Sequence, residues 1–288
     1  MKILVTGANG QLGKALQELE TLYPNLQFYF CSKENLNIAD LQEVEAFFER
    51  IQPDHCINCA AYTAVDKAEI EREAAFLINQ TGVRNLARIS SQSKTRFIHI
   101  STDYVFDGTG DAPYREDHPV NPQNVYGESK LEGEKEALAV NADSLIIRTA
   151  WVYSEHGNNF VKTMLRLMQS KEEIGVVADQ MGSPTYAGDL ASAILSIISS
   201  DKWTPGIYHY SNEGIISWYE FAKAIQAHTQ SACRVNAIPT TAYPTPAKRP
   251  AYSVLDKEKI KLTYGLKIPD WEESLYYCLG KLKKVGAW

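Results

Sequence analysis

The sequence contains no long apolar run and no excess of positive charge. A membrane-spanning helix needs roughly 20 consecutive, mainly apolar residues, and the apolar runs of this 288-residue chain are much shorter. Its 29 Lys and Arg residues are outnumbered by 35 Asp and Glu residues, so the formal net charge is −6. We therefore expect neither a membrane nor a nucleic acid as partner, although an acidic protein can keep a local basic pocket for an anionic ligand.

Cysteine is also scarce, and only the segment HCINC, residues 55–59, has motif-like spacing. That segment has the composition of a buried strand, in which residues three apart point to opposite faces. Cys56 and Cys59 are therefore interpreted as small apolar core residues, and we expect no disulfide and no metal site. The first residues, MKILVTGANGQLG, lack the cleavage site of a signal peptide, so we interpret them as a first strand and expect a cytoplasmic protein.

Short apolar runs alternate with amphipathic segments through the first half of the chain. Predicted strands cover residues 2–6, 26–31, 55–60, 96–101 and 144–153, and predicted helices cover residues 11–22, 41–51 and 72–92, with a further one around residues 126–130. This alternation is typical of a parallel sheet covered by helices on both faces. The predicted fold class is therefore α/β, a Rossmann-type doubly wound parallel sheet with a smaller α+β substrate-binding domain.

The second half of the chain is less regular. Helices are predicted at residues 158–169, 189–200 and 218–228, whereas three prolines keep residues 240–253 extended. We assign residues 1–150 to a dinucleotide-binding domain, to which residues 186–209 return. Residues 151–185 and 210–288 are assigned to the substrate-binding domain.

A glycine-rich turn follows the first predicted strand. Gly7, Gly10 and Gly13 are spaced G-x-x-G-x-x-G and open a helix. Such glycines permit a tight turn, let backbone amides approach a pyrophosphate and let the helix pack on the strand, while the helix N-terminus attracts the phosphates. The sequence therefore predicts a dinucleotide cofactor.

The end of the second strand indicates which dinucleotide is bound. NAD-specific proteins carry an acidic residue there for the ribose hydroxyls, but this chain reads Cys31, Ser32 and Lys33. A serine and a lysine suit the additional phosphate of NADPH, so we expect NADPH, with NADH possible. Asp40 could contact the adenine, although it would serve equally well as the N-cap of the helix over residues 41–51.

Tyr126 and Lys130 lie one helical turn apart in the segment NVYGESK. A free tyrosine has a pKa of about 10, and a neighbouring ammonium lowers that pKa towards the range useful for proton transfer. Thr102 follows the fourth strand directly, at the carboxyl edge where ligands of such sheets bind. The sequence therefore predicts a catalytic set of Thr102, Tyr126 and Lys130.

These segments together resemble a known family. TGANGQLG, NCAAYTAVDKAE, STDYVFDG, YGESK, DQMGSPTYAGDLA and AYPTPAKRPAYSVLD are similar to the extended short-chain dehydrogenase/reductases, and within them to the dTDP-4-dehydrorhamnose reductases. The resemblance implies reduction of a 4-keto group on a dTDP-linked sugar, the last step of dTDP-L-rhamnose synthesis for cell-wall polysaccharide. It assigns the proton donor to Tyr126, the ribose contact to Lys130 and carbonyl polarisation to Thr102.

The resemblance also assigns binding residues. The implied cofactor contacts are Gly7, Gly10, Gln11, Leu12, Gly13, Asp40, Leu41, Ala61, Tyr62 and Thr63. The implied substrate contacts are Asp103, Trp151, Asn159 and Arg249. Some relatives dimerise through a magnesium site near the start of the first helix, where this chain has Lys14 and Ala15, so we expect a monomer, with a weak homodimer as the alternative.

Two rival functions stay open. An epimerase or another nucleotide-sugar ketoreductase would share these motifs, whereas a 4,6-dehydratase would want an Asp-Glu pair after the threonine, and Asp103 is followed by Tyr104. A non-catalytic NADP-binding regulatory subunit would be free to lose Tyr126 or Lys130, and both are present.

Overall fold

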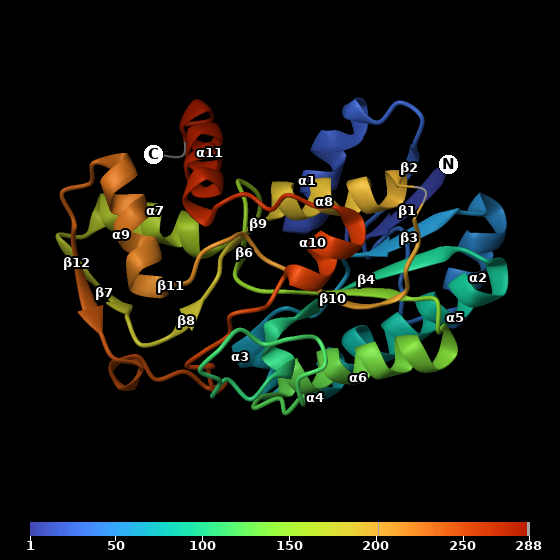
Figure 1. Ribbon diagram of the computed structural model, residues 1–288, viewed down its shortest axis with the longest axis horizontal. Coiled ribbons are helices and arrows are strands. Elements are labelled where there is room, and N and C mark those ends of the chain that lie inside the picture. Colours follow the sequence, from blue (N-terminus) through green and yellow to red (C-terminus); the bar gives the residue numbers. More distant parts are fainter. Residues whose placement is uncertain (201, 287–288) are drawn as a thin grey trace.

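A six-stranded parallel sheet forms the centre of the larger part of the molecule (Figure 1). The computed structural model describes residues 1–200 and 202–286. In spatial order the strands are β10 (Gly206–Tyr210), β5 (Leu145–Thr149), β4 (Arg96–Thr102), β3 (His55–Asn58), β1 (Lys2–Thr6) and β2 (Gln27–Cys31). All neighbouring pairs run parallel. The chain places β2 on one side of β1 and then β3, β4 and β5 on the other side. Such sheets bind nucleotides at the point between β1 and β3 where this direction changes.

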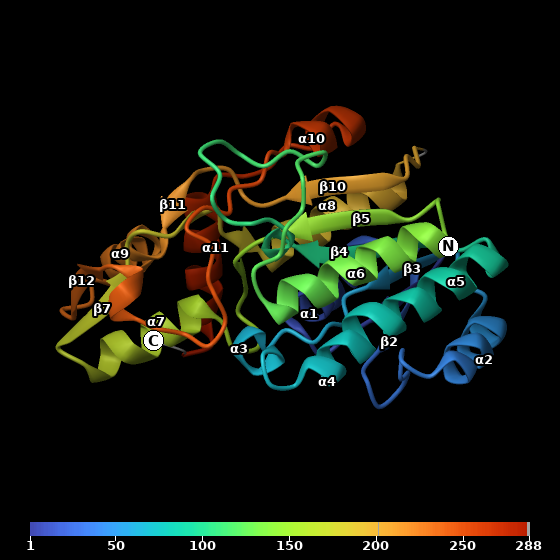
Figure 2. The same ribbon diagram turned by 90° about the horizontal axis from the view of Figure 1, so that it is seen from below.

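Helices cover both faces of this sheet (Figures 1 and 2). Ile3 and Val5 pack in one apolar cluster, while Leu4 between them packs in another, as expected for a strand buried on both faces. The first face is covered by α1 (Gln11–Leu19), α8 (Ala187–Ser199) and α10 (Glu258–Tyr264), and the second by α2 (Leu41–Ile51), α5 (Val83–Ser93) and α6 (Val125–Val140). The predicted α/β class is confirmed.

The remaining elements form a second, smaller group with its own apolar core, on the left of Figure 1. Its helices are α7 (Phe160–Ser170), α9 (Trp218–Thr229) and α11 (Trp271–Lys284), and its paired strands are β7 (Glu173–Val177) with β12 (Arg234–Ile238) and β8 (Met181–Gly182) with β11 (Ile216–Ser217). Residues 240–253 contain one 3-10 turn, Thr240–Ala242, and several bends, but no longer helix or strand. None of these strands, nor α10 and α11, was predicted from the sequence.

Two predicted elements are interrupted. The helix predicted over residues 72–92 consists of α4 (Arg72–Phe76), the π-helical segment η2 (Leu77–Gly82) and α5. The strand predicted over residues 144–153 ends at Thr149, and β6 (Val152–Tyr153) pairs instead with β9 (Thr185–Tyr186). Trp151, at the break, has a φ of 48°, in the left-handed region that ordinary residues rarely adopt.

The segments that carry candidate site residues are short. Ala61, Tyr62 and Thr63 lie between β3 and the short helix α3 (Val65–Ala68). Asp103 begins the 3-10 turn η3 (Asp103–Val105), which follows β4 directly. A further 3-10 turn, η1 (Glu20–Leu22), follows α1. Within residues 1–200 and 202–286, no helix is both long and apolar enough to cross a membrane.

Candidate active site

The glycine-rich turn joins β1 to α1 at the carboxyl edge of the sheet. Gly7 has a φ of 67°, and a Cβ atom there would lie 2.6 Å from the backbone nitrogen of Ala60. A Cβ atom on Gly13 would lie 2.5 Å from the carbonyl oxygen of Gly7, so both positions need glycine. Gly10 is the N-cap of α1, and no side chain among the described residues caps that helix. The amides of Gln11, Leu12 and Gly13 at this terminus therefore fit a pyrophosphate.

Thr102, Tyr126 and Lys130 meet beside that turn. Thr102 ends β4, and its hydroxyl donates to Oδ1 of Asp103 at 3.0 Å and lies near enough to the phenol of Tyr126 to act on the pKa of that phenol. Tyr126 lies in the first turn of α6, which begins after the N-cap Asn124. Lys130 lies one turn further along and is only 1% exposed. A hydroxyl and a phenol therefore lie together at the carboxyl edge of the sheet, while the Nζ atom of Lys130 contacts the Ile100 carbonyl oxygen and His99 on β4.

The electrostatics of this set differ from the prediction in one respect. Lys130 Nζ donates to the carbonyl oxygen of Ile100 at 2.6 Å rather than to Tyr126. Burial raises the pKa of Tyr126 above its ordinary value, and the hydrogen bond with Thr102 only partly offsets this effect. The expectation that Lys130 lowers the pKa of Tyr126 is therefore wrong for this arrangement, because burial dominates and the nearby Asp103 and Tyr104 raise the pKa further.

Asp103 contacts Thr102, and Trp151 follows β5. Burial raises the pKa of Asp103 to about 6, against the opposing hydrogen bond from Thr102, and Oδ2 of Asp103 has no hydrogen-bond partner among the described residues. The indole of Trp151 stacks on Trp218 with centroids 3.5 Å apart. A Cβ atom on Gly182 would lie 2.6 Å from the Trp151 ring, so only glycine admits the indole there.

Arg249, in the segment of residues 240–253, contacts residues that follow β3 and β4 at the carboxyl edge of the sheet. Its Nη2 pairs with Oδ2 of Asp66 at 2.7 Å, and its Nη1 donates to the hydroxyl of Tyr104 at 3.0 Å. The Tyr104 ring in turn meets Tyr126 edge to face, with centroids 5.6 Å apart. Arg249 is therefore linked to the phenol of Tyr126 through one intervening side chain, Tyr104.

Two side chains predicted to bind different ligands contact each other. Asn159, the N-cap of α7, donates to Oε1 of Gln11 at 2.8 Å, and Gln11 donates to the carbonyl oxygen of Val152 at 3.2 Å. The glycine-rich turn and the smaller group of elements are thereby joined. The amide of Asn159 is engaged in these contacts and in two further backbone contacts.

The remaining predicted cofactor contacts flank the same edge. Ala61, Tyr62 and Thr63 follow β3, and the amide of Asn79 holds the backbone of Tyr62 through two hydrogen bonds. Leu41 begins α2, and the Asp40 carboxylate accepts from the amides of Gln42 and Glu43. Asp40 is therefore the N-cap of α2, the second of its two predicted roles.

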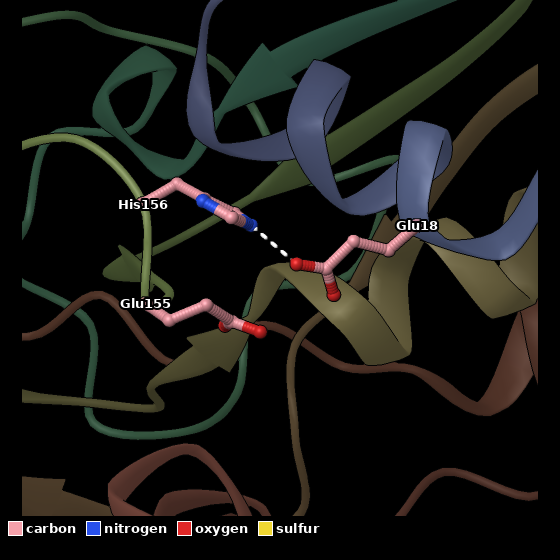
Figure 3. Close-up of side chains that lie close together, drawn as sticks. All are labelled: Glu18, Glu155 and His156. Atoms are coloured by element: carbon pink, nitrogen blue, oxygen red, sulfur yellow. Dashed lines mark hydrogen bonds and ion pairs between the residues drawn. The ribbon is translucent and has the colours of Figure 1, made fainter. Parts of the chain in front are cut away.

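One group of metal-ligand side chains lies within the part of the chain that the structure describes. Glu18 of α1, Glu155 and His156 converge as Figure 3 shows, with His156 Nε2 2.7 Å from the Glu18 carboxylate. The ammonium of Lys281 on α11 contacts both carboxylates. Lys281 thus already supplies a positive charge, and we interpret this cluster, named the α1–α11 ion cluster, as a contact between elements.

A separate groove lies at the opposite edge of the sheet. Its volume is about 860 Å³, and Glu49, Asp54, His55 and Arg96 are among the residues that line it. Ligands of open α/β sheets bind at the carboxyl ends of the strands. We therefore place the active site at the edge that carries Thr102.

Several residues of the site were not predicted. Asp66 and Tyr104 hold Arg249, and Asn79 holds Tyr62 and donates to the hydroxyl of Ser129. Asn58 and His99 lie on β3 and β4 behind Lys130. For Asn58, Asn79 and His99 the available signal was a polar residue inside a mainly apolar segment, since a buried polar group requires a partner.

The fold and this arrangement define the class. The sheet order, the uncapped glycine-rich turn and the Thr102, Tyr126 and Lys130 set are features of a dinucleotide-dependent enzyme of the short-chain dehydrogenase/reductase type.

Comparison with known proteins identifies the family. Residues 1–284 match the family described as RmlD substrate binding domain. The chain is 42% identical over 284 residues to a dTDP-4-dehydrorhamnose reductase of Aggregatibacter actinomycetemcomitans, covering 95% of this chain and 97% of the relative. It is 45% identical over 274 residues to the spore coat polysaccharide biosynthesis protein SpsK of Bacillus subtilis, covering 95% of each.

A solved structure agrees with these sequence relatives. The dTDP-4-dehydrorhamnose reductase of Bacillus anthracis in complex with NADP has a TM-score of 0.93 and 42% identity, covering 97% of this chain and 99% of that one. The chain belongs to the RmlD substrate binding domain family.

Proposed function

We propose that this chain reduces the 4-keto group of dTDP-4-dehydro-L-rhamnose with NADPH and so forms dTDP-L-rhamnose. The observation that carries the proposal is Thr102 beside Tyr126, with Lys130 one helical turn further along α6, at the edge of the sheet that also carries the uncapped glycine-rich turn. Relatives that match almost the whole chain bear the name dTDP-4-dehydrorhamnose reductase, and one of them was solved with NADP.

The three side chains suit the two halves of a ketone reduction. The nicotinamide, when bound, supplies a hydride to the carbonyl carbon. Thr102 turns its hydroxyl proton from Asp103 to the carbonyl oxygen, on which negative charge develops. Tyr126 then gives its proton to that oxygen. Because burial raises the pKa of Tyr126, the phenol keeps its proton at neutral pH until an alkoxide, a stronger base, forms beside it.

The binding residues divide between the two ligands. We assign the cofactor to Gly7, Gly10, Gln11, Leu12, Gly13, Asp40, Leu41, Ala61, Tyr62 and Thr63, and the sugar nucleotide to Asp103, Trp151, Asn159 and Arg249. Oδ2 of Asp103 is buried without a hydrogen-bond partner among the described residues, so a sugar hydroxyl would satisfy it, and the Trp151 indole offers an apolar face. The guanidinium of Arg249 suits a diphosphate, although its present partner Asp66 would have to share it.

The proposed preference for NADPH has a local basis. Ser32 and Lys33 follow β2, and Ser32 already hydrogen-bonds Glu34 at 2.5 Å and Asn35 at 2.9 Å. Both partners accept the serine proton, so Ser32 would have to exchange Glu34 for a ribose 2′-phosphate, to which Lys33 would offer the positive charge.

The experiment that tests the function is oxidation of NADPH by the purified protein with freshly generated dTDP-4-dehydro-L-rhamnose, with NADH in parallel. Tyr126→Phe should lower kcat by roughly 10²–10⁴-fold, the usual contribution of a positioned proton donor. Its affinity for NADPH should stay within about twofold, because the phenol is assigned to the sugar. Tyr276→Phe, which removes a hydroxyl that bonds Glu272 on α11, is the matched control.

Two outcomes would overturn the proposal. Full kcat in Tyr126→Phe would remove the assignment of the proton donor. Tight NADPH binding without oxidation of the cofactor would exclude this keto sugar as substrate.

We further propose that the protein acts as a monomer in the cytoplasm, where its nucleotide substrates would be made. Sedimentation velocity with and without NADPH tests the oligomeric state, and a stable dimer in both conditions would overturn that part.

A further inference from the structure

A chain of buried polar side chains lies behind Lys130 and crosses three strands of the sheet. It runs from Thr6 on β1 through Asn58 on β3 and His99 on β4 to Lys130 on α6. Each of these four residues is at most 1% exposed. Polar groups so deep in an apolar sheet cost free energy to bury unless they are hydrogen-bonded. We therefore assign the donor and the acceptor in each contact between these four side chains.

The backbone fixes which way the Asn58 amide points. The N–H of Ala60 lies 3.2 Å from Oδ1 of Asn58, and the Thr6 hydroxyl lies 2.7 Å from the same atom. A backbone N–H can only donate, so the atom that faces it must be the amide oxygen. The NH₂ group of Asn58 therefore faces Nδ1 of His99, at 3.0 Å.

That contact fixes the tautomer of His99. Because the Asn58 NH₂ can only donate, Nδ1 of His99 accepts and carries no proton. Burial, with the Lys130 charge adding to it, holds the pKa of His99 well below its usual range, so the ring is neutral. The single ring proton is therefore on Nε2, which lies 3.4 Å from Nζ of Lys130.

An N–H on Nε2 has opposite effects on the two forms of Lys130. An ammonium presents only N–H groups, so two donors would face each other across the 3.4 Å contact. A neutral amine has a lone pair that can accept this N–H. The Ile100 carbonyl, 2.6 Å from Nζ, accepts a hydrogen bond from either form.

The other groups around Lys130 do not fully offset the unfavourable contact between its ammonium form and the N–H of His99. Glu134, one turn along α6, favours the ammonium, but it already pairs with Arg148 of β5 at 2.7 Å and accepts from Ser101 of β4. Burial raises the pKa of the Cys59 thiol after β3 to about 12, so it stays uncharged. Burial likewise lowers the pKa of Lys130 to about 8, against the opposing influence of Glu134.

We propose that Asn58 and His99 are positioning residues that destabilise the ammonium form of Lys130, by holding an N–H group rather than a lone pair against its Nζ atom. Lys130 then changes its charge just above neutral pH instead of staying an ammonium throughout. The consequence for catalysis rests on the proposed function, in which Lys130 holds the ribose beside Tyr126. The arrangement of protons itself does not depend on that function.

The first test is the tautomer in the unmodified protein. With ¹⁵N-labelled histidine, NMR should show a His99 ring protonated on Nε2 alone and unchanged between about pH 6 and 9, a range in which an ordinary exposed histidine titrates. The signal is assigned by its loss in His99→Gln. A ring protonated on Nδ1, or one that gains a second proton in this range, would overturn the proposal.

The second test is the titration of Lys130, followed by NMR with ¹⁵N-labelled lysine and assigned by its loss in Lys130→Met. His99→Gln places an amide near the position of Nε2, and the amide can turn its oxygen towards Nζ. The proton affinity of Lys130 should then rise about tenfold, which is one pKa unit. His99→Asn is the matched control, because its shorter amide can face Asn58 but does not reach Nζ, and its shift should be smaller.

An unchanged titration of Lys130 in His99→Gln would overturn the proposal, as would a shift to lower pH. The pH dependence of kcat/KM adds the functional readout, since its alkaline limb should move with the Lys130 signal. A protein inactive on the proposed substrate would contradict the proposed function, while the two NMR results would still decide the role of Asn58 and His99.

Discussion

Asp103 shows what a single buried carboxyl does to the energetics of this site. It is only 3% exposed, and burial raises its pKa to about 6. A carboxyl with a raised pKa in the folded state binds a proton more tightly there than in the unfolded chain, so the stability of the fold falls as the pH rises from about 4 to 6. Above that range, Asp103 destabilises the free protein.

Asp103→Asn should therefore stabilise the protein in a pH-dependent way. The amide keeps an oxygen to accept from Thr102 but carries no charge to desolvate. A shift of about 2 pKa units corresponds to at most about 3 kcal/mol at pH 7, with no gain below about pH 4. Urea unfolding at both pH values measures the difference, and an equal or lower stability at pH 7 would contradict the argument.

The residues of the site differed in how far the sequence could predict them. Gly7, Gly13, Thr102, Tyr126 and Lys130 belong to local motifs whose spacing carries the chemistry. The contact of Arg249 with Asp66, and the effect of burial on the pKa of Tyr126, depend on segments far apart in the chain. No local pattern reports such contacts.

Among the elements, the π-helical segment η2 has the clearest structural role. It places Asn79 where one amide holds the backbone of Tyr62 and also reaches Ser129 on α6, next to Lys130. Segments of this kind often lie at functional sites. Helix α6 packs closely against it, because a Cβ atom on Gly133 would lie 2.0 Å from the carbonyl oxygen of Asn79.

Gly133→Ala should therefore destabilise the protein by roughly 1–3 kcal/mol, the usual cost of overpacking. Gly280→Ala is the matched control, because Gly280 also lies in a helix but a Cβ atom there would meet no other atom within 4 Å among the described residues. It should stabilise by about 0.5–1 kcal/mol through helix propensity alone. Thermal unfolding of both variants measures the contrast, and equal changes in Tm would contradict the close packing.

Elements were predictable where the pattern was local. The predicted bounds of β1 and α2 agree with the structure, since an apolar run after Met1 and a capping Asp40 mark them. The break at Trp151 was not predictable, because the stacking partner Trp218 lies in a distant helix. The π-helical segment was missed because its sequence also fits an uninterrupted helix.

At the scale of the molecule, two groups of elements are tied together at several points. We propose that residues 1–150 and 186–209 form the dinucleotide-binding domain and that residues 151–185 and 210–288 form the sugar-binding domain. The hydrogen bond between Gln11 and Asn159 joins them, and so does the α1–α11 ion cluster of Glu18, Glu155, His156 and Lys281. Burial acts to raise the pKa of Glu18, but hydrogen bonds from Lys281 and His156 hold it below its usual value.

Lys281→Met should weaken this tie, because the carboxylates of Glu18 and Glu155 would face each other without the ammonium. The loss at pH 7 should be about 1 kcal/mol, since the cluster is partly exposed and screened by solvent. A lowered carboxyl pKa stabilises the fold only above the titration of the unfolded carboxyl, so the difference should shrink as the pH falls below about 4.5.

Urea midpoints at pH 7 and at about pH 3.5 measure this effect. Lys284→Met, at an exposed position of the same helix, is the control. A loss that is the same at both pH values would assign the effect to packing of the lysine stem instead of to charge.

The position of β10 at one edge of the sheet has a consequence for how the protein is made. This strand and helix α8, which packs on α1, come from the region of residues 187–210. A ribosome therefore completes the glycine-rich turn and helix α6, which carries Tyr126 and Lys130, before it supplies β10, the strand that pairs with β5. During that interval the nascent chain carries an open strand edge and an uncovered apolar face, the two features that promote aggregation. The cofactor-binding part of the molecule thus depends for its completion on a segment translated after the first stretch of the sugar-binding part, residues 151–185, and before the rest of it.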